Sequence, residues 1–315
     1  MSNARANPSG SNDGQASSER TGGSLYALGA FLAWGLFPIY WKWLGAFPAI
    51  ELIAHRIVFA FVFYWLFTLK NGSRAFAWLD LFRDRRQGLA IIAATVLLTT
   101  NWILYVWAVN DGHVVEASLG YFITPLLNVL SGFLFLKEKL SRARWTAIAL
   151  AAAGVLVLAV QGGTFPWISV SIALTFSMYG LIRKQLKANV FATSTAETGV
   201  LLVPALLYVI YERFFDMTAH QASLGEAGLL VLSGVITGLP LIWFAQAARR
   251  LPLSSLAFFQ YIAPSIQFLL GVVAYQEPFD ITKLQAFALI WAALAIFSWD
   301  SFRKRPGPRA ITPPE

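Results

Sequence analysis

The chain has 315 residues, of which 57% are hydrophobic and 13% are charged, and its mean hydropathy is +0.60. Soluble globular domains carry about 25% charged residues, so this composition excludes an ordinary soluble protein and indicates an integral membrane protein. The formal net charge of +8 would suggest nucleic-acid binding in a soluble protein, but the cations here lie in short loops between apolar runs, and we expect no nucleic-acid partner. The chain has no cysteine and only three widely separated histidines, so we expect no disulfide, no metal cluster and no cofactor.

The two ends of the chain are polar. Residues 1–23 are rich in Ser, Gly and Asn, and residues 302–315 contain four prolines, so both stretches are expected to be disordered cytoplasmic tails. No short apolar run with a small-residue cleavage site precedes the first long apolar segment, so we expect no cleaved signal peptide.

Ten apolar segments lie between these tails. Each has roughly the 17–25 residues that a membrane-spanning helix needs, and together they predict an all-α integral membrane protein with ten transmembrane helices. The segments cover approximately residues 24–42, 50–69, 88–108, 115–136, 145–161, 166–183, 195–211, 227–247, 254–275 and 284–301.

Two of these regions repeat one pattern. Residues 101–138 and 240–277 each hold a proline in the middle of an apolar segment, an amide three residues later and an acid at the end. Such repeats determine the architecture before any single residue is interpreted. One offset of 139 residues aligns Pro125 with Pro264, Asn128 with Gln267, and Glu138 with Glu277.

The repeat predicts a first unit over residues 24–161 and a second unit over residues 162–301, with five helices in each. Because five is an odd number, the second unit crosses the membrane in the opposite sense, which makes a 5+5 inverted repeat. Inverted repeats are typical of secondary transporters, where the binding site lies near the midplane between two halves that exchange inward-open and outward-open shapes.

The distribution of Lys and Arg predicts the orientation. With the N-terminus inside, 20 of the 24 Lys and Arg residues belong to the inner side, three belong to the outer side, and Arg56 lies within the second segment. Cytoplasmic loops carry such an excess, so both termini are expected to be cytoplasmic.

Polar and aromatic side chains deep in the predicted helices are candidates for a binding site. Pro125 and Pro264 each free a backbone carbonyl, and we interpret them either as cavity-lining kinks or as kinks satisfied by packing. Amides at membrane depth line a cavity or form helix–helix hydrogen bonds, and deep aromatic rings wall a pocket or pack against other helices. The candidate substrate-binding residues are Trp34, Asn101, Trp102, Tyr105, Tyr121, Asn128, Tyr179, Gln246, Gln260 and Gln267.

Four charged or titratable residues are candidates for gating or coupling. Glu51 and His55 are four residues apart and share a helix face, whereas Arg56 lies deeper and needs a partner such as Glu51 or a carbonyl of residues 34–40. We interpret these three as an outer gate, a proton relay or an anion site, or alternatively as a structural ion pair. Glu197 opens the seventh segment as Glu51 opens the second, and we interpret it as an inner gate or as a solvated N-terminal acid.

Several stretches resemble one known family. They are LAWGLFPIYWKWL (residues 32–44), ELIAHR (51–56), the whole of 101–145, SMYGLIRK (177–184) and SSLAFFQYIAPSIQFLLGVVAYQEPF (254–279). These are similar to the RarD group of chloramphenicol-sensitivity proteins, within the EamA-repeat permeases of the drug/metabolite transporter superfamily. The resemblance covers about residues 24–300. It implies ten helices in a 5+5 inverted repeat, a cavity walled by helices 1–4 and 6–9, and export of metabolites or drugs by proton antiport or exchange.

The sequence therefore predicts a permease of the bacterial inner membrane that exports a small organic solute or drug-like metabolite by alternating access, with protons or a counter-solute as coupling partner. Phosphate-loop, G-x-S-x-G and H-E-x-x-H motifs do not occur in the sequence, so we do not expect an enzyme. The alternatives are a membrane receptor or scaffold, and a membrane enzyme acting on a lipid-like substrate. Small-residue spacings such as Gly29/Ala33 fit internal packing and a homodimer equally.

Overall fold

The computed structural model describes residues 9–70, 74–137, 139–186, 189–215, 220–251 and 259–303, and within these ranges every regular element is a helix. Eight described segments are long and apolar enough to cross a membrane, so the predicted all-α membrane protein is confirmed. The elements are α1 (Ser9–Gly35), α2 (Phe37–Trp43), α3 (Ala49–Lys70), η1 (Ala77–Phe82), α4 (Arg85–Asn110), α5 (Val114–Leu136), α6 (Arg142–Gln161), α7 (Trp167–Gln185), α8 (Val190–Phe214), α9 (Leu224–Arg250), α11 (Ile262–Leu269), η2 (Leu270–Ala274) and α12 (Ile281–Arg303).

Two of the ten predicted segments are not among these eight spans. The sixth segment forms α7, which is less apolar because it carries buried polar residues, Ser169 and Ser177, that face protein rather than lipid. The ninth forms the short pair α11 and η2, and residues 252–258 of that segment lie outside the described ranges. The count of ten spans and the inverted repeat therefore stay predictions.

The first helix differs from the sequence expectation at both ends. α1 begins at Ser9, so helical backbone covers residues 9–23, which were predicted to be a disordered tail. No proline interrupts this stretch, and extending an existing helix adds one hydrogen bond for each residue ordered. At its other end α1 stops at Gly35, and α2 starts afresh with Pro38 in its first turn, where a missing N–H is tolerated.

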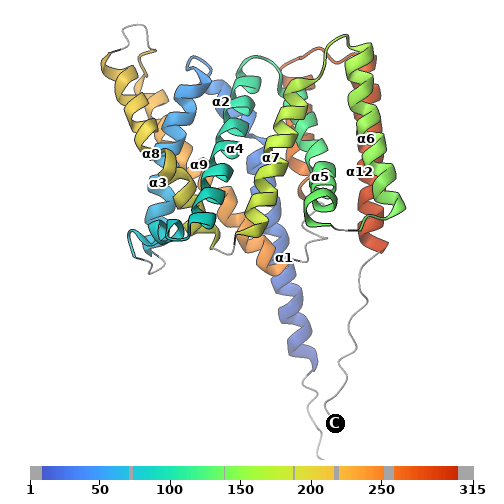
Figure 1. Ribbon diagram of the computed structural model, residues 1–315, viewed down its shortest axis with the longest axis horizontal. Helices are drawn as coiled ribbons and strands as arrows, with labels where there is room; N and C mark the ends of the chain where they lie inside the picture. Colours follow the sequence, from blue (N-terminus) through green and yellow to red (C-terminus); the bar gives the residue numbers. More distant parts are fainter. Residues whose placement is uncertain are drawn as a thin grey trace, which may run out of the picture.

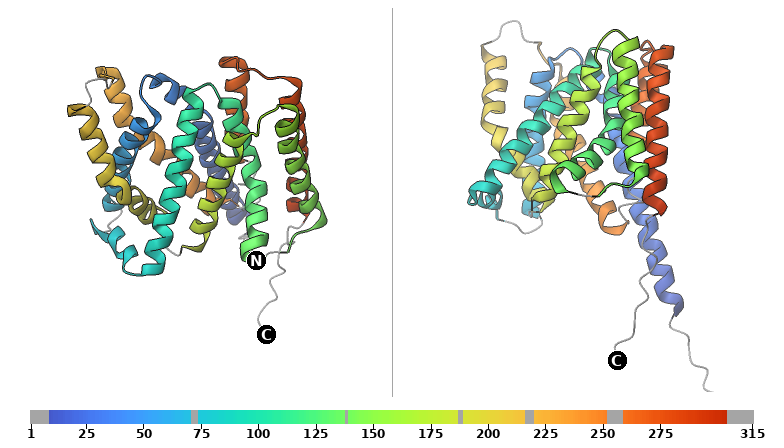
Figure 2. Two further views of the ribbon diagram at one scale, coloured as in Figure 1. Left: turned by 45° about the horizontal axis from the view of Figure 1, so that its top comes forward. Right: turned by 45° about the vertical axis from the view of Figure 1, so that its right-hand side comes forward.

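The helices form a bundle in which partners come from distant parts of the sequence. α6 and α12 lie side by side at one edge (Figures 1 and 2), while α5 packs on α7, α1 on α9, and α3 on both α8 and α9. Small residues permit the closest of these approaches. At the α6–α12 contact, a Cβ on Gly154 would lie only 3.0 Å from the carbonyl oxygen of Ala286.

Buried apolar side chains form two main clusters. The larger one joins α2, α3, α4 and α7 and includes Trp41, Leu52 and Ile172. The second joins α5, α6 and α12 and includes Phe122 and Phe287. Within a membrane such contacts stabilise by close packing, because lipid is as apolar as the side chains.

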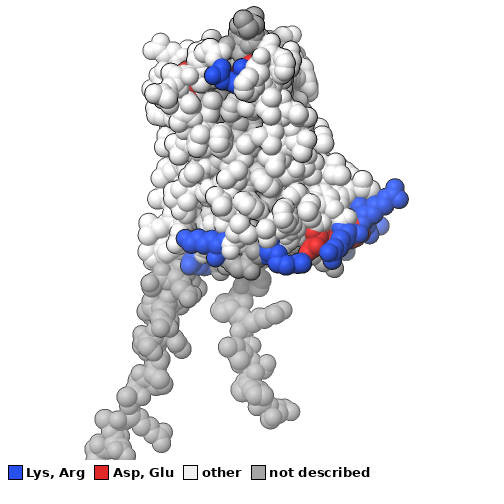
Figure 3. Space-filling view, turned by 90° about the vertical axis from the view of Figure 1, so that its left-hand side faces the viewer, with Lys and Arg blue, Asp and Glu red and all other residues white. Residues whose placement is uncertain are grey.

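One end of the bundle carries most of the charge. α1 begins and α12 ends at this end (Figure 1), and Lys and Arg side chains gather along the same rim in the space-filling view, with a smaller group at the opposite end (Figure 3). We call it the basic end of the bundle. Its position relative to the membrane is a prediction from the charge distribution.

The N-terminus of α5 is capped by an acid from the second half of the chain. The Glu277 carboxylate accepts hydrogen bonds from the backbone N–H groups of Val114 (2.7 Å) and Val115 (2.8 Å). The first N–H groups of a helix have no partner within the helix, and the helix dipole favours an anion there. Glu277 therefore ties the segment after η2 to the start of α5.

The two prolines of the repeat occupy different positions in their helices. Pro125 lies inside α5, as predicted. Pro264 was predicted to lie midway along the ninth helix, but α11 begins at Ile262 after the N-cap residue Tyr261, so Pro264 is in the first turn. A proline is tolerated there because the N–H it removes would have no partner in the helix.

Candidate functional site

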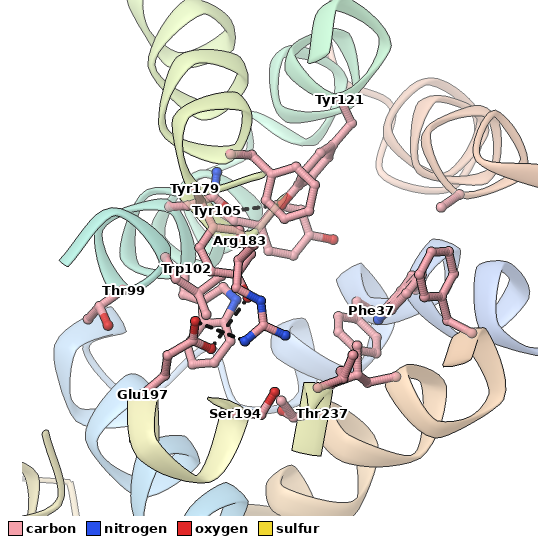
Figure 4. A pocket seen from close by; sticks show the side chains of 18 of the residues that line it. Phe37, Thr99, Trp102, Tyr105, Tyr121, Tyr179, Arg183, Ser194, Glu197 and Thr237 are labelled. Carbon is pink, nitrogen blue, oxygen red and sulfur yellow. Dashed lines mark hydrogen bonds and ion pairs between the residues drawn. The ribbon is translucent and has the colours of Figure 1, made fainter. Parts of the chain in front are cut away.

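A cavity of about 760 Å³ lies inside the bundle. Its lining comes from α1, α2, α3, α4, α5, α7, α8, α9 and α11, and Figure 4 shows side chains from several of these helices converging on it. Binding pockets for drug-sized molecules have volumes of roughly 300–1,000 Å³. The cavity therefore has room for a small organic solute, and both halves of the chain build it.

Aromatic side chains dominate the wall. All five aromatic residues that we singled out line the cavity, and Tyr105 and Tyr121 pack edge to face with ring centroids 5.6 Å apart. Five phenylalanines and one tyrosine that we did not single out also line it. The aromatic lining residues are Trp34, Trp102, Tyr105, Tyr121 and Tyr179, together with Phe31, Phe37, Tyr64, Phe176, Phe191 and Phe244.

Asn101 links two helices from within the cavity wall. Its Nδ2 donates to the carbonyl of Ile172 (3.0 Å) and to the Thr175 hydroxyl (3.1 Å), and its Oδ1 accepts from the Tyr121 hydroxyl (3.3 Å). The residue is only 1% exposed. The two readings that the sequence left open are both met here, because one amide serves as a helix–helix hydrogen bond and as cavity lining.

The remaining amides divide between the cavity and its surroundings. Gln267 donates from Nε2 to the carbonyl of Trp34 (3.1 Å), and its buried Oε1 has no hydrogen-bond partner among the described residues. Asn128 and Gln260 also line the cavity. Gln246 does not, and its Oε1 instead accepts a hydrogen bond from Arg250 (2.6 Å). Gln246 thus lies apart from the amides with which it was grouped.

A buried ion pair lines one side of the cavity. Arg183 donates to the Glu197 carboxylate (3.2 Å), which also accepts from the Tyr179 hydroxyl (3.4 Å), and Figure 4 shows the three side chains meeting. Glu197 was expected at a gate or in solvent, and its side chain is 3% exposed. Arg183 was not among the predicted site residues, because its position at the end of the sixth apolar segment groups it with the cytoplasmic loop cations. Its spacing of four residues from Tyr179, which puts both on one helix face, was the available signal.

Arg56 also lines the cavity, but with partners other than those predicted. Its Nε donates to the hydroxyl of Thr237 (2.9 Å), and its guanidinium lies over the ring of Trp102 at 3.9 Å and that of Trp41 at 5.3 Å. The sequence had suggested Glu51 or a carbonyl of residues 34–40. Thr237 is 181 positions away in the sequence, so no local pattern could have identified it.

The other two residues of the predicted Glu51–His55–Arg56 group do not line the cavity. The ring Nδ1 of His55 lies 3.0 Å from the carbonyl oxygen of Glu51 in its own helix, and Glu51 is 5% exposed. Glu51 and His55 share one helix face, whereas Arg56 is rotated onto the next. Their predicted gating and coupling roles stay predictions.

The cavity reaches the basic end of the bundle. Asn189 at the N-terminus of α8, Ala248 near the end of α9 and Gln260 before α11 all line it. Towards the other end, the Tyr40 hydroxyl donates to the carbonyl of Leu229, and Trp41 is 1% exposed. Pro125 and Pro264 both line the cavity, and their role as kinks stays a prediction.

Comparisons with known proteins agree with a transporter. Residues 21–160 match the EamA-like transporter family. The chain is 43% identical over 299 residues to Protein RarD of Streptomyces exfoliatus, with 94% of each chain covered. It is 40% identical over 283 residues to the uncharacterized transporter YojE of Bacillus subtilis, with 89% of this chain and 95% of that protein covered.

Two more distant similarities extend this picture. The Chloramphenicol-sensitive protein RarD of Pseudomonas aeruginosa is 28% identical over 285 residues, with 89% of this chain and 95% of that protein covered. A protein of known crystal structure matches with a TM-score of 0.57 and 20% identity, covering 91% of this chain and 99% of that one, which shows a shared fold. The high identities over most of the chain confirm the resemblance: this is a multi-pass bacterial membrane transporter that belongs to the RarD group of the EamA-like transporter family.

Proposed function

We propose that the chain is a secondary transporter of the bacterial inner membrane that exports a small organic solute or drug-like metabolite by alternating access. The observation that carries this proposal is the cavity of about 760 Å³, which has an aromatic wall and polar groups and is built by helices from both halves of the chain. A cavity within a helix bundle is where a transporter binds its solute. A scaffold has no need of such a cavity, and the flux measurement described below distinguishes a transporter from a receptor.

The packing of the helices supports a 5+5 inverted repeat, with units over residues 24–161 and 162–301. If α1 to α6 and α7 to α12 are equivalent units, then each contact between them should have a counterpart. α5 packs on α7 as α11 packs on α1, and α4 packs on α7 as α9 packs on α1. α6 with α12 and α3 with α8 are their own counterparts. This exchange of partners is what a two-fold relation between the units predicts.

The aligned amides support the same relation. Gln267 of α11 donates to the carbonyl of Trp34 in α1. Asn128, its counterpart in α5, has its Oδ1 3.8 Å from where a Cβ on Gly180 of α7 would lie. Trp34-Gly35 and Tyr179-Gly180 are the positions that align in the two units. Each amide therefore meets the corresponding turn of the other unit.

The distribution of charge assigns the orientation of the bundle in the membrane, and the end at which the cavity opens assigns its conformational state. The basic end of the bundle is assigned to the cytoplasm because cytoplasmic loops carry the excess of Lys and Arg. The cavity reaches that end through Asn189 and Gln260, and the Tyr40–Leu229 contact lies on the other side. We assign this arrangement to the inward-open state, in which a cytoplasmic solute enters before export. Glu197, which is paired with Arg183 in this state, takes part in gating or coupling, with protons or a counter-solute supplying the driving force.

A ligand screen followed by flux measurement tests the solute-binding cavity. Thermal unfolding of the purified full chain is measured with amino acids, other metabolites and drugs, including chloramphenicol, at pH 6 and pH 8. A ligand at a hundredfold excess over its dissociation constant stabilises the folded state by about 2.7 kcal/mol. Asn128→Ala and Gln267→Ala should abolish the shift, whereas Gln246→Ala, a matched amide outside the cavity, should not. Proteoliposomes must then move the hit unchanged; binding without flux would refute a transporter.

Site-directed labelling tests the orientation. The natural chain has no cysteine, so single cysteines can be introduced without background. Lys139→Cys and Gln260→Cys should react with a membrane-impermeant maleimide only from the cytoplasmic side, and Thr164→Cys only from the outside. Labelling of Lys139→Cys from the outside would contradict the assigned orientation, and protection of Gln260→Cys from both sides would contradict an inward-open state.

A further inference from the structure

The charge of the cavity lining indicates what kind of solute it accepts. Among the described residues that line the cavity, the charged ones are Arg56, Arg183 and Glu197, which leaves one positive charge in excess. Glu197 already accepts hydrogen bonds from Arg183 and Tyr179. The excess charge is therefore that of Arg56.

The surroundings of Arg56 are unusual for a cation in a membrane. The residue is 4% exposed. Its guanidinium lies over the rings of Trp102, Trp41 and Phe37 at 3.9, 5.3 and 6.0 Å, and its Nε donates to the Thr237 hydroxyl at 2.9 Å. A ring face and a hydroxyl compensate a buried charge only weakly. Thr237 holds Nε, so Nη1 and Nη2 remain as the parallel donors that match the two oxygens of a carboxylate.

A second group beside Arg56 lacks a partner. The Tyr105 hydroxyl is buried without a hydrogen-bond partner among the described residues, the residue is 3% exposed, and it lines the same cavity. It follows Trp102 by three residues on the same face of α4, and the ring of Trp102 lies 3.9 Å from the Arg56 guanidinium. A buried hydroxyl without a partner is costly, and its O–H is a donor that an anionic oxygen accepts well.

From these contacts, and on the basis of the proposed transport function, we infer that Arg56 and Tyr105 form an anion subsite and that the solute is a monoanionic aromatic acid. The carboxylate binds the Arg56 guanidinium and the Tyr105 hydroxyl, and the apolar body lies against Trp102, Tyr121 and Phe176, which line the cavity beside them. A cationic solute is disfavoured because the one acid of the described lining, Glu197, is already held by Arg183.

Three compounds that share one phenylpropyl skeleton and carry a negative, a neutral or a positive head group test this inference. The probes are 3-phenylpropanoate, 3-phenylpropanamide and 3-phenylpropan-1-amine at pH 7, and the protein is the full chain in nanodiscs of phosphatidylcholine, which has no net charge. Apparent dissociation constants come from the dependence of the unfolding temperature on ligand concentration. The acid should bind about tenfold more tightly than the amide, because charge-assisted bonds are roughly twice as strong as neutral ones, and the amine should bind most weakly.

Variants assign the preference to Arg56. Arg56→Gln should remove the preference for the acid and leave the affinity for the amide unchanged, while Arg56→Lys should retain part of it. Arg85→Gln, at the exposed start of α4, is the matched control and should change nothing. If Arg56→Gln does not fold, Tyr105→Phe and Thr237→Val provide the same test, since each should weaken binding of the acid alone.

Several outcomes of the same binding measurements would contradict the anion subsite. Equal affinity for acid and amide in the natural protein, no binding of the acid at millimolar concentration, or a preference for the acid that survives Arg56→Gln would each overturn the anion subsite. Equal binding of all three probes that still depends on Asn128 and Gln267 would overturn the subsite alone and leave the solute cavity standing. Failure of the proposed function is distinguished by the absence of flux for every solute that binds.

Discussion

Lys137 and Gln276 both have a positive φ angle although 139 residues separate them. Their φ angles are 55° and 52°, and they are the only non-glycine residues with positive φ in the described part of the chain. Lys137 ends α5, and Gln276 follows η2. The offset is the one that aligns Pro125 with Pro264, so the positive φ angles lie at matched positions of the predicted repeat.

The positive φ angles of Lys137 and Gln276 predict how substitutions at these two positions affect stability. L-residues with a side chain pay about 1–2 kcal/mol in this conformation, and β-branched ones pay most, whereas glycine does not. We expect Gln276→Gly to raise the unfolding temperature of the purified protein and Gln276→Val to lower it, with the same order for Lys137. Equal effects of Gly and Val at either position would contradict the positive φ angle there.

The Glu277 cap predicts a loss of stability on removing its carboxylate. Both of its oxygens accept backbone N–H groups at the start of α5, and losing a cap of this kind costs about 1–2 kcal/mol. Glu277→Ala should therefore lower the unfolding temperature, and Glu277→Gln should lower it less because the amide keeps one acceptor. Glu212→Gln in the last turn of α8 is the control. A Glu277→Ala variant as stable as this control would show that the cap contributes nothing.

The Arg183–Glu197 pair predicts non-additive variants. Removing one partner of a buried pair leaves an uncompensated charge and costs about 3–5 kcal/mol, whereas removing both is often far less damaging. Arg183→Gln and Glu197→Gln should each be strongly destabilised, and the double variant should be more stable than either. A double-variant cycle of unfolding temperatures measures the coupling. Additive effects would mean that the pair does not form in the membrane.

Two glycines of α9 predict opposite outcomes for one substitution. A Cβ on Gly234 would overlap the backbone carbonyl of Phe59 in α3, while a Cβ on Gly228 would meet nothing within 4 Å. Gly234→Ala must push the two helices apart and should cost about 1–3 kcal/mol. Gly228→Ala should be neutral or stabilising, because alanine favours a helix over glycine by about 1 kcal/mol. Similar unfolding temperatures for the two variants would contradict the close α3–α9 contact.

Much of the candidate site could be predicted, and the exceptions have definite causes. Depth and polarity were sufficient to select Asn101, Trp102 and Tyr121, because a polar or amphipathic side chain in the middle of a span must face protein or a cavity. Gln246 was selected on the same grounds, but it lies near the end of α9, where Arg250 donates a hydrogen bond to its side chain. Arg183 was overlooked because a cation at the end of a span resembles a loop residue until its partner is known.

The sequence by itself determined the membrane class and the family, and it predicted ten spans and an inverted repeat. These follow from the composition, from the lengths of the apolar segments and from matched residues at one offset, all of which can be read along the sequence. Only the tertiary structure decided that Arg56 bonds to Thr237, that Arg183 bonds to Glu197, and that Glu277 caps α5. Each of these contacts joins separate helices, and which faces meet depends on how close small residues such as Gly234 allow the helices to approach.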